Sequence, residues 1–336
     1  MSTPPFVAIH DIPFLNLTEL GDRHVPLLPL WDGTRWSLWL KLEDEGFMEM
    51  HPVDVAASLY FAANPARDTD ILFPFSNFIW QQASWPTVAE PARSIESRLE
   101  SLSTAIAKID FFWEHREHPT LDIADFVATE VEYVSVVARG VLDDLQKVMA
   151  AVWSKAVLVS ADAQKRKRAL PSRSMADMCL KGQKLRTAAE LMATYSLPEP
   201  IAKFYERSGS LLQRVRRLRD SVVHGGTREL DQKGPVFVAE KGFATGCGDR
   251  LYEAFPDIWR DEYAVNSNVY SLRPLLAHLT LNVLQICSEA ADVLSCCLRF
   301  PGPVAPGHRV FIRAPHNAAL LKLQKVLQGG NPWWAT

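Results

Sequence analysis

The longest amphipathic stretch of this chain is residues 122–157, which read DIADFVATEVEYVSVVARGVLDDLQKVMAAVWSKAV. Its apolar side chains recur every three or four residues, at Ile123, Val127, Val131, Val134, Val137, Val141, Leu145, Val148 and Val152. An α-helix turns once in about 3.6 residues, so this spacing places all of them on one face. The stretch therefore predicts a single long helix with one buried side. Gly140 predicts a bend within that helix.

Similar patterns predict further helices on both sides of this stretch. They lie at 53–63, 71–82, 87–113, 175–195, from 197 to a stop at Gly225-Gly226, at 270–298 and at 316–328. The segment 160–174 contains Lys165-Arg-Lys-Arg168 and predicts an exposed basic loop. The fold expected from these patterns is mostly α, a bundle of long antiparallel helices.

The first 46 residues have a β character. Two apolar runs, at 25–31 and 35–41, flank Asp32-Gly33-Thr34, and an Asp-Gly pair between such runs predicts a β-hairpin. Two prolines in the first run would confine it to a sheet edge, because proline has no N–H to donate. Three regions are expected along the chain. They are an N-terminal region at 1–119, a helical bundle at 120–300 with residues 227–268 inserted, and a C-terminal tail with a short helix at 301–336. Within the insertion, 236–238 predicts a short strand.

The composition is typical of a folded protein that does not span a membrane. Apolar residues make up 48 % and charged residues 22 %, and the net charge is −3. The longest apolar stretch, 275–298, is interrupted by His278, Glu289 and Asp292. The five cysteines form no C-x-x-C pair, and the N-terminus has no signal-peptide pattern. Buried thiols in a reducing, cytoplasmic environment are therefore expected.

Positive charge is concentrated in the middle of the chain. Residues 165–228 hold 15 lysines and arginines against 5 acidic residues. Such a stretch favours either a site for a polyanion or a solvated basic helix face with a flexible loop.

A compact motif, LRDSVVHGG at 218–226, ends the helix that begins after Leu197. Arg219 is followed directly by Asp220 and, five residues on, by His224. An arginine can hold two phosphate oxygens, and an imidazole can act as a general acid or base near neutral pH. The negative end of the helix dipole favours the protonated imidazole. The alternative is structural: Arg219 pairs with Asp220 or Glu206, and His224 caps the helix.

Arg219 and His224 do not lie one above the other on a straight helix. Five residues correspond to about 500°, so the two side chains point about 140° apart. A site that uses both therefore needs a helix end loosened by the two glycines, or a second copy of the motif from another protomer.

This pattern resembles the HEPN superfamily (higher eukaryotes and prokaryotes nucleotide-binding). The signature of that family is an arginine, a polar residue and a histidine after four to six intervening residues. Arg219, Asp220 and His224 match these positions, with Asp220 in place of the commoner asparagine. The resemblance covers about residues 122–298 and implies a HEPN-like helical bundle. It leaves the first 120 residues unexplained, and these are expected to form a small β-hairpin-containing region.

The resemblance implies metal-independent RNA cleavage by a homodimer, an activity of many toxins and defence effectors. His224 would be the general acid or base, Arg219 the phosphate clamp and Asp220 the orienting group. No metal or cofactor is expected, and the partners would be RNA and an antitoxin or regulatory protein. Further contacts with RNA phosphates are expected from Lys165, Arg166, Lys167, Arg168, Arg216 and Arg217. Other members are not catalytic, so a nucleotide-binding or protein-interaction module remains the alternative.

Three other features are candidate sites. His115 and His118 are spaced i, i+3 at a predicted helix end, whereas a helical metal pair uses i, i+4. Arg273 and His278 repeat the arginine–histidine spacing inside an apolar helix, where His278 is expected to be a hydrogen-bonded core histidine. Glu130 interrupts the apolar face of the 122–157 helix and either pairs with an arginine of the motif helix or lies on a solvated flank.

Overall fold

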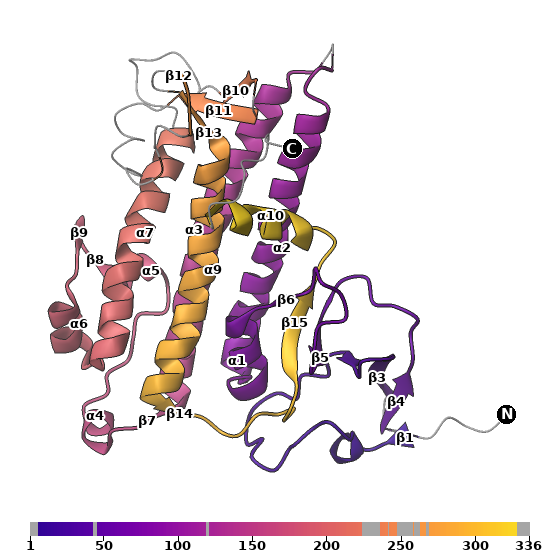
Figure 1. Cartoon of the computed structure of the whole chain (residues 1–336). Helices are drawn as coiled ribbons and strands as arrows, with labels where there is room; N and C mark the ends of the chain where they lie inside the picture. The colour runs from indigo at the N-terminus through magenta and orange to yellow at the C-terminus, as the bar shows by residue number, and fades with distance from the viewer. Residues whose placement is uncertain are drawn as a thin grey trace.

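A computed structural model describes residues 6–42, 46–118, 121–223, 236–240, 242–246, 258, 263–266 and 269–327. Long helices lying side by side form the centre of the molecule (Figure 1). They are α2 (Pro86–Glu114), α3 (Ile123–Lys155), α7 (Glu199–Val223) and α9 (Leu272–Cys297). Helix α3 packs against the other three, and α10 (Asn317–Leu327) packs on α2 and α9. The long helices expected from the sequence are thus present, and α3, α9 and α10 have bounds within two residues of those predicted.

Helix α3 forms because its sequence supplies both a start signal and a continuous apolar face. The Asp122 side chain accepts a hydrogen bond from the Asp125 N–H at 3.3 Å, which satisfies one of the free donors of the first turn. All the apolar residues of the predicted face are buried. Gly140 has a packing role here, because a methyl group at this position would overlap the Arg98 guanidinium of α2.

A buried carboxylate joins α2 to α3. Asp144 accepts hydrogen bonds from Ser94 Oγ at 2.6 Å, Arg98 Nε at 2.8 Å and Lys147 Nζ at 2.7 Å. Burial alone would raise the pKa of Asp144, but the hydrogen bonds from Lys147, Ser94 and Arg98 outweigh it and hold that pKa below its usual value. Arg98 can reach Asp144 because Gly140 leaves room for its guanidinium.

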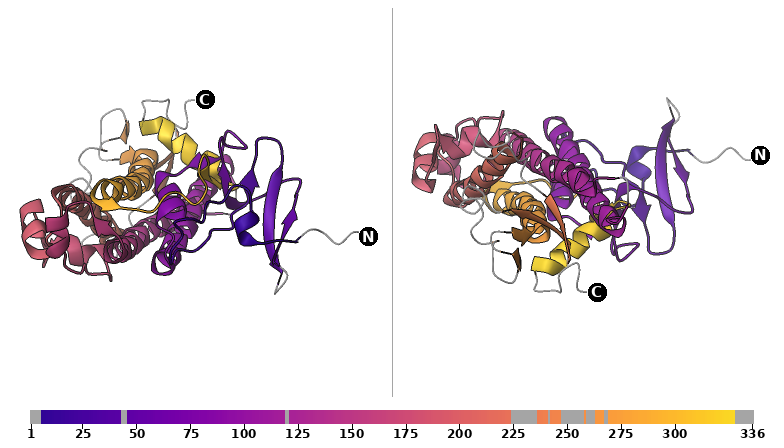
Figure 2. Two further views of the ribbon diagram at one scale, coloured as in Figure 1. Left: turned by 90° about the horizontal axis from the view of Figure 1, so that it is seen from below. Right: turned by 90° about the horizontal axis from the view of Figure 1, so that it is seen from above.

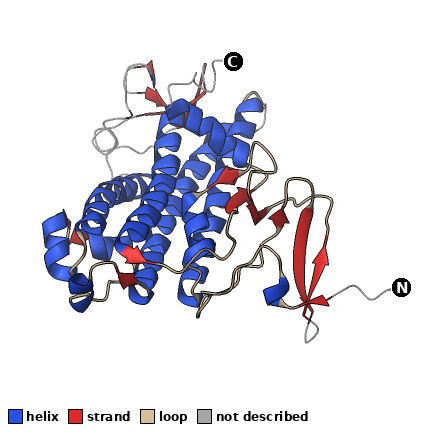
Figure 3. Cartoon of the chain, turned by 60° about the horizontal axis from the view of Figure 1, so that its bottom comes forward, coloured by secondary structure: helices blue, strands red, loops and turns tan. Residues whose placement is uncertain are grey.

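The N-terminal part of the structure contains a mixed sheet of seven strands (Figure 3). In spatial order these are β1 (Phe6–Val7), β4 (Gly46–Met50), β3 (Trp36–Leu42), β2 (Leu30–Trp31), β5 (Ser58–Ala62), β15 (Arg309–Arg313) and β6 (Ile71–Leu72). The β2–β5 pair is parallel and the other pairs are antiparallel. The expected fold class, a HEPN-like helical bundle with only a small hairpin region, is therefore wrong. Strands β1, β2 and β6 are only two residues long, too short to give a periodic sequence signal, and β15 comes from the other end of the chain.

The predicted hairpin is present at β2 and β3, where Leu30 faces Ser37 and Trp31 faces Trp36. Asp32 Oδ1 accepts hydrogen bonds from the N–H groups of Thr34 at 2.8 Å and Arg35 at 2.9 Å. These bonds, the one from Arg35 first, lower the pKa of Asp32 to about 2. Gly33 supplies the positive φ of +101° that the turn requires.

The expectation that the first strand of this hairpin lies at a sheet edge is wrong. Strand β2 lies between β3 and β5. It is only two residues long, and Pro26 and Pro29 lie before the paired residues. The backbone N–H groups that these prolines lack therefore cost the sheet no hydrogen bond. The Pro29 carbonyl itself accepts a hydrogen bond from the Phe61 N–H at 2.8 Å.

Two predicted helices are also wrong in type or extent. Residues 53–63 contain strand β5 instead of a helix, and residues 71–82 form β6 followed by α1 (Pro74–Gln82). An apolar run such as Leu-Tyr-Phe fits a buried strand as well as a helix, and here the partners β2 and β15 decide the outcome.

The helix predicted at 175–195 is divided into two. Helices α5 (Met175–Cys179) and α6 (Ala188–Tyr195) are separated by the hairpin of β8 (Leu180–Lys181) and β9 (Lys184–Leu185). Gly182 turns this hairpin with a φ of +66°. A new helix then starts at a capping box formed by Thr187 and Glu190.

A four-stranded sheet lies at the end of the bundle where α7 ends and α9 begins (Figure 1). Its order is β10 (Val236–Ala239), β11 (Gly242–Gly246), β13 (Val269–Ser271) and β12 (Ala264–Asn266), so the strand predicted at 236–238 is confirmed. Phe243 of β11 packs edge-on against Trp113 near the end of α2, with ring centroids 5.5 Å apart. At the other end of the bundle β7 (Val157–Leu158) pairs with β14 (Leu298–Arg299), and α4 (Ala161–Lys165) follows β7.

The three expected regions of the chain interlock in space. Helix α2, from the expected N-terminal region, packs against α3 of the expected bundle, and β15, from the expected tail, lies inside the seven-stranded sheet. Viewed along the bundle, this sheet lies on one side of the long helices, while α6 and the start of α7 lie on the other (Figure 2). Within the described ranges, no helix combines the length and apolar character needed to cross a bilayer.

Candidate functional site at the C-terminal end of α7

The motif singled out in the sequence lies on and just after the last turns of α7. The helix includes Arg219 and Asp220 and ends at Val223, so its backbone ends immediately before His224. The side chains of Arg219 and Asp220, and the whole of His224, lie outside the described part of the structure. The motif is therefore placed by the helix that carries it, at the end of the bundle that also bears the four-stranded sheet (Figure 1).

The second half of α7 is strongly cationic. Between residues 207 and 219 it carries five arginines and no acidic residue. Arg207 pairs with Glu289 of α9 at 3.6 Å. Arg216 and Arg217 lie directly before the motif, and both side chains are exposed. Cationic side chains near a helix C-terminus interact favourably with the negative end of its dipole. The surface that leads to the motif can therefore attract an anion.

A histidine from α9 lies beside the motif helix. Arg214 Nη1 is 3.4 Å from His278 Nε2, and His278 is half-buried. Because an arginine can only donate, His278 Nε2 is the acceptor in this contact. The expected core histidine is thus bonded to the motif helix itself. Its partner lies 64 residues away along the chain, and no local pattern reveals it.

A partly buried ion cluster holds the scaffold together at this end. Lys322 of α10 lies 3.5 Å from Asp110 of α2, and Arg273 at the start of α9 interacts with the same carboxylate. Burial raises the pKa of Asp110, against the opposing effect of the two cations. Burial also lowers the pKa of Arg273 to about 10, and Asp110 opposes this. The cluster joins α2, α9 and α10, so its role is to fix these helices against one another.

Glu130 does not pair with an arginine of α7. Its Oε1 accepts a hydrogen bond from Lys108 Nζ of α2 at 2.9 Å, and Glu130 thus faces the neighbouring helix on its other side. Its second oxygen is buried and accepts no hydrogen bond from any residue that the structure describes. Of the two alternatives for Glu130, the pair with an arginine of the motif helix is therefore wrong.

The basic residues predicted to contact RNA fall into two separate groups. Arg168 Nη1 donates to the Thr194 carbonyl at 2.9 Å, just before α7 begins, whereas Arg216 and Arg217 lie near its end. With 25 residues, α7 is about 37 Å long, at about 1.5 Å per residue. The group at 165–168 and the motif therefore lie near opposite ends of this helix.

Part of the group at 165–168 is also engaged in packing. Lys167 Nζ donates to the Ala156 carbonyl at 2.5 Å and lies 5.1 Å from the centre of the Trp153 ring. Burial lowers the pKa of Lys167. Lys165 is exposed, and its Nζ lies 4.0 Å from Asp162. The segment expected to be a loop contains the short helix α4.

His115 and His118 lie beyond the end of α2. The His115 ring is 4.1 Å from the Phe111 ring, and its Nδ1 lies 2.9 Å from the Phe111 carbonyl oxygen. Across the described ranges, no group of three or more histidine, cysteine or acidic side chains has the arrangement of a metal site.

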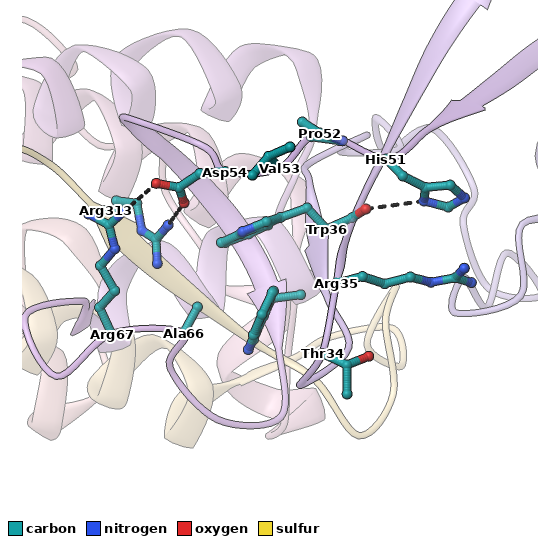
Figure 4. Close-up of a pocket in the computed structure, with 11 residues that line it drawn as sticks. Thr34, Arg35, Trp36, His51, Pro52, Val53, Asp54, Ala66, Arg67 and Arg313 are labelled. Atoms are coloured by element: carbon teal, nitrogen blue, oxygen red, sulfur yellow. Dashed lines mark hydrogen bonds and ion pairs between the residues drawn. The ribbon is translucent and has the colours of Figure 1, made fainter.

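A cavity of about 360 Å³ lies in the N-terminal sheet and is lined by aromatic and charged side chains (Figure 4). Arg313 on β15 is almost fully buried and donates to Asp70 Oδ2 at 2.8 Å and Asp54 Oδ1 at 2.8 Å, while its guanidinium lies 4.7 Å from the Trp36 ring. Figure 4 shows Asp54 held between Arg313 and Arg67, which also pairs with it. Asp54 and Asp70 already neutralise the positive charges of Arg313 and Arg67, so this network stabilises the sheet. For the same reason, the cavity attracts an anion less strongly than the surface of α7 does.

Comparison with protein-family models, with curated proteins and with solved structures found no match for this chain. The resemblance to the HEPN superfamily stays a prediction that depends on three residues. The function of this chain is therefore inferred from the chemistry of those residues and from the course of α7.

Proposed function

We propose that this protein cleaves RNA without a metal ion at the C-terminal end of α7. The observation that carries the proposal is the course of this helix. It continues through Arg219 and Asp220, ends at Val223, and so presents His224 directly after a cationic half-helix. A phosphate-binding arginine beside a titratable histidine, on a surface that attracts polyanions, is the minimum that such chemistry requires.

The chemistry follows from the two side-chain types. A neutral His224 removes the proton of the 2′-hydroxyl, whose oxygen attacks the adjacent phosphorus. Arg219 holds the non-bridging phosphate oxygens as negative charge develops on them. A protonated imidazole then gives its proton to the leaving 5′-oxygen. The products are a 2′,3′-cyclic phosphate and a 5′-hydroxyl, and DNA is not cut because it lacks the nucleophile.

Two histidines serve this reaction better than one, because one accepts a proton while the other donates. A homodimer that brings two α7 ends together supplies both. It also removes the problem that Arg219 and His224 of one chain point about 140° apart on a regular helix. Arg216 and Arg217 would then border a composite site and contact phosphates on either side of the cut. The antitoxin or regulatory partner implied by the resemblance would act by covering this site.

RNA cleavage by the purified protein in EDTA tests the proposal. We expect His224→Ala and Arg219→Ala each to lower the cleavage rate by a factor of about 10² to 10⁴, the usual contribution of such groups. His10→Ala and Arg173→Ala change an exposed histidine and an exposed arginine elsewhere and are the matched controls. Circular dichroism checks that all variants are folded, and a single 2′-deoxynucleotide at the cut should block cleavage there.

Two results would overturn the proposal. One is cleavage that survives in folded His224→Ala protein at the wild-type rate. The other is RNA binding by the wild type with no cleavage of any substrate, which would identify a non-catalytic binding module instead. Light scattering of the active protein should give the mass of a dimer, and a strictly monomeric active species would contradict the composite site.

A further inference from the structure

A second cavity lies between the seven-stranded sheet and the helices. Its volume is about 300 Å³, and its walls come from β5, β6 and β15 on one side and from α2, α9 and α10 on the other. Figure 1 shows β6 and β15 beside the lower half of α2, with α10 above them. Most of its lining is apolar, with Leu59, Ile71, Phe73, Leu99, Leu284, Ile312 and Leu320. Small-molecule sites are typically mostly apolar, with a few fixed polar groups and volumes from roughly 300 Å³ upward.

One carboxyl group, that of Glu96 on α2, is fixed in this apolar wall. Its Oε1 accepts hydrogen bonds from Ser76 Oγ and Trp80 Nε1 of α1, both at 2.7 Å. Its Oε2 accepts no hydrogen bond from the residues that the structure describes. Burial raises the pKa of Glu96 to about 7, against the opposing effects of Ser76, Trp80 and Arg93. The side chain is thus held in one orientation with one acceptor atom unused.

Glu96 is partly buried, and its fixed, unused Oε2 can accept a hydrogen bond from a ligand without reorientation of the side chain. The lining also includes polar side chains such as Ser58, Ser97 and Asn317, but most of its surface is apolar. A ligand that places an N–H donor at Oε2 and an apolar body against the walls satisfies both parts of the cavity.

We propose that this cavity binds a small apolar molecule that carries a primary amine, with the ammonium group donating to Glu96 Oε2. A charged donor strengthens the hydrogen bond to a carboxylate. The positive charge of Arg313 is already matched by Asp70 and Asp54, and Arg93 is exposed, so water and salt screen it. This site is independent of the proposed RNA cleavage, because the cavity and α7 share no residue.

Calorimetric titration with 2-phenylethylamine and with 2-phenylethanol at neutral pH tests the proposal. The two probes share an apolar body and differ in the headgroup. We expect the amine to bind with a dissociation constant in the millimolar range or below, and at least about tenfold more tightly than the alcohol. In Glu96→Gln protein the preference should disappear, while the amide oxygen still accepts from Ser76 and Trp80 and preserves the fold.

Glu90→Gln is the matched control, because Glu90 is an exposed glutamate of the same helix that does not line this cavity. It should leave amine binding unchanged. Leu284→Phe narrows the cavity and should weaken both probes. Equal binding of amine and alcohol, no binding of either, or loss of the preference in Glu90→Gln instead of Glu96→Gln would each overturn the proposal. None of these measurements involves RNA, so their outcome is separate from that of the proposed function.

Discussion

Replacing Gly140 with alanine tests the packing of α2 against α3, because helix propensity and packing predict opposite signs. Alanine is favoured over glycine by about 1 kcal/mol in a helix interior. A side chain at 140 would, however, overlap the Arg98 guanidinium, which donates to the buried Asp144 at 2.8 Å. The guanidinium must therefore move away, and Asp144 loses one of its three donors.

The size of the loss follows from that one hydrogen bond. A hydrogen bond to a charged group contributes about 1.5–3 kcal/mol. The lower end applies here, because the Arg98 side chain is 37 % exposed and Asp144 keeps Ser94 and Lys147. A loss of about 1.5 kcal/mol against a gain of about 1 kcal/mol leaves Gly140→Ala less stable than wild type by about 0.5 kcal/mol.

A double-mutant cycle measured by urea unfolding separates the two effects. In Arg98→Ala protein the space beside residue 140 is empty, so Gly140→Ala should now stabilise by about 1 kcal/mol. The coupling between the two sites should therefore be about 1.5 kcal/mol. If Gly140→Ala stabilises the wild type and the Arg98→Ala protein equally, Arg98 does not restrict position 140 and the packing argument is refuted.

Three further results are expected. Arg313→Ala leaves Asp70 buried without its cation and should lower the free energy of unfolding by about 3–5 kcal/mol; a loss under about 1 kcal/mol in urea unfolding would contradict this. Glu96 has a pKa of about 7 in the folded state against an ordinary 4.5, so folded protein holds this proton more tightly than unfolded protein. As the pH rises between those two values, the contribution of Glu96 to the free energy of unfolding should fall by about 3 kcal/mol. Urea unfolding of Glu96→Gln protein at pH 5 and at pH 8 should not show this fall. Iodoacetamide should alkylate exposed Cys296 far faster than Cys179, whose pKa burial raises to about 12; equal rates in peptide mass mapping would contradict the burial.

The long helices could be predicted from the sequence because their signal is local and repeated. Nine apolar residues on one face of 122–157 leave little alternative to a helix, and Asp122 marks its start. The same holds for the turn at Asp32-Gly33, where a four-residue pattern determines the hydrogen bonds. Such features depend on neighbours in the chain and hardly at all on the rest of the fold.

The seven-stranded sheet could not be predicted in the same way. Strand β5 has an apolar run that suits a helix equally well, and its partner β15 lies about 250 residues further along the chain. The same separation hides the ion pairs of Arg313, since no spacing rule connects it to Asp70. At the candidate site, local sequence identified the motif, whereas the contact between Arg214 and His278 depends on how α7 and α9 pack.

The position of β15 inside the sheet has a consequence for the order in which the protein is built. On the ribosome, β5 and β6 emerge early, but the strand that lies between them is synthesised only after nearly all of the bundle. Helices α2 and α3 are adjacent in sequence and can pair at once, whereas the sheet must wait with unpaired edges. In a nascent chain stopped before Arg309, α2 and α3 would thus already be packed together. The sheet would still have exposed strand edges that can pair with other chains. During synthesis, the unpaired edges of β5 and β6 are where a chaperone would be needed most.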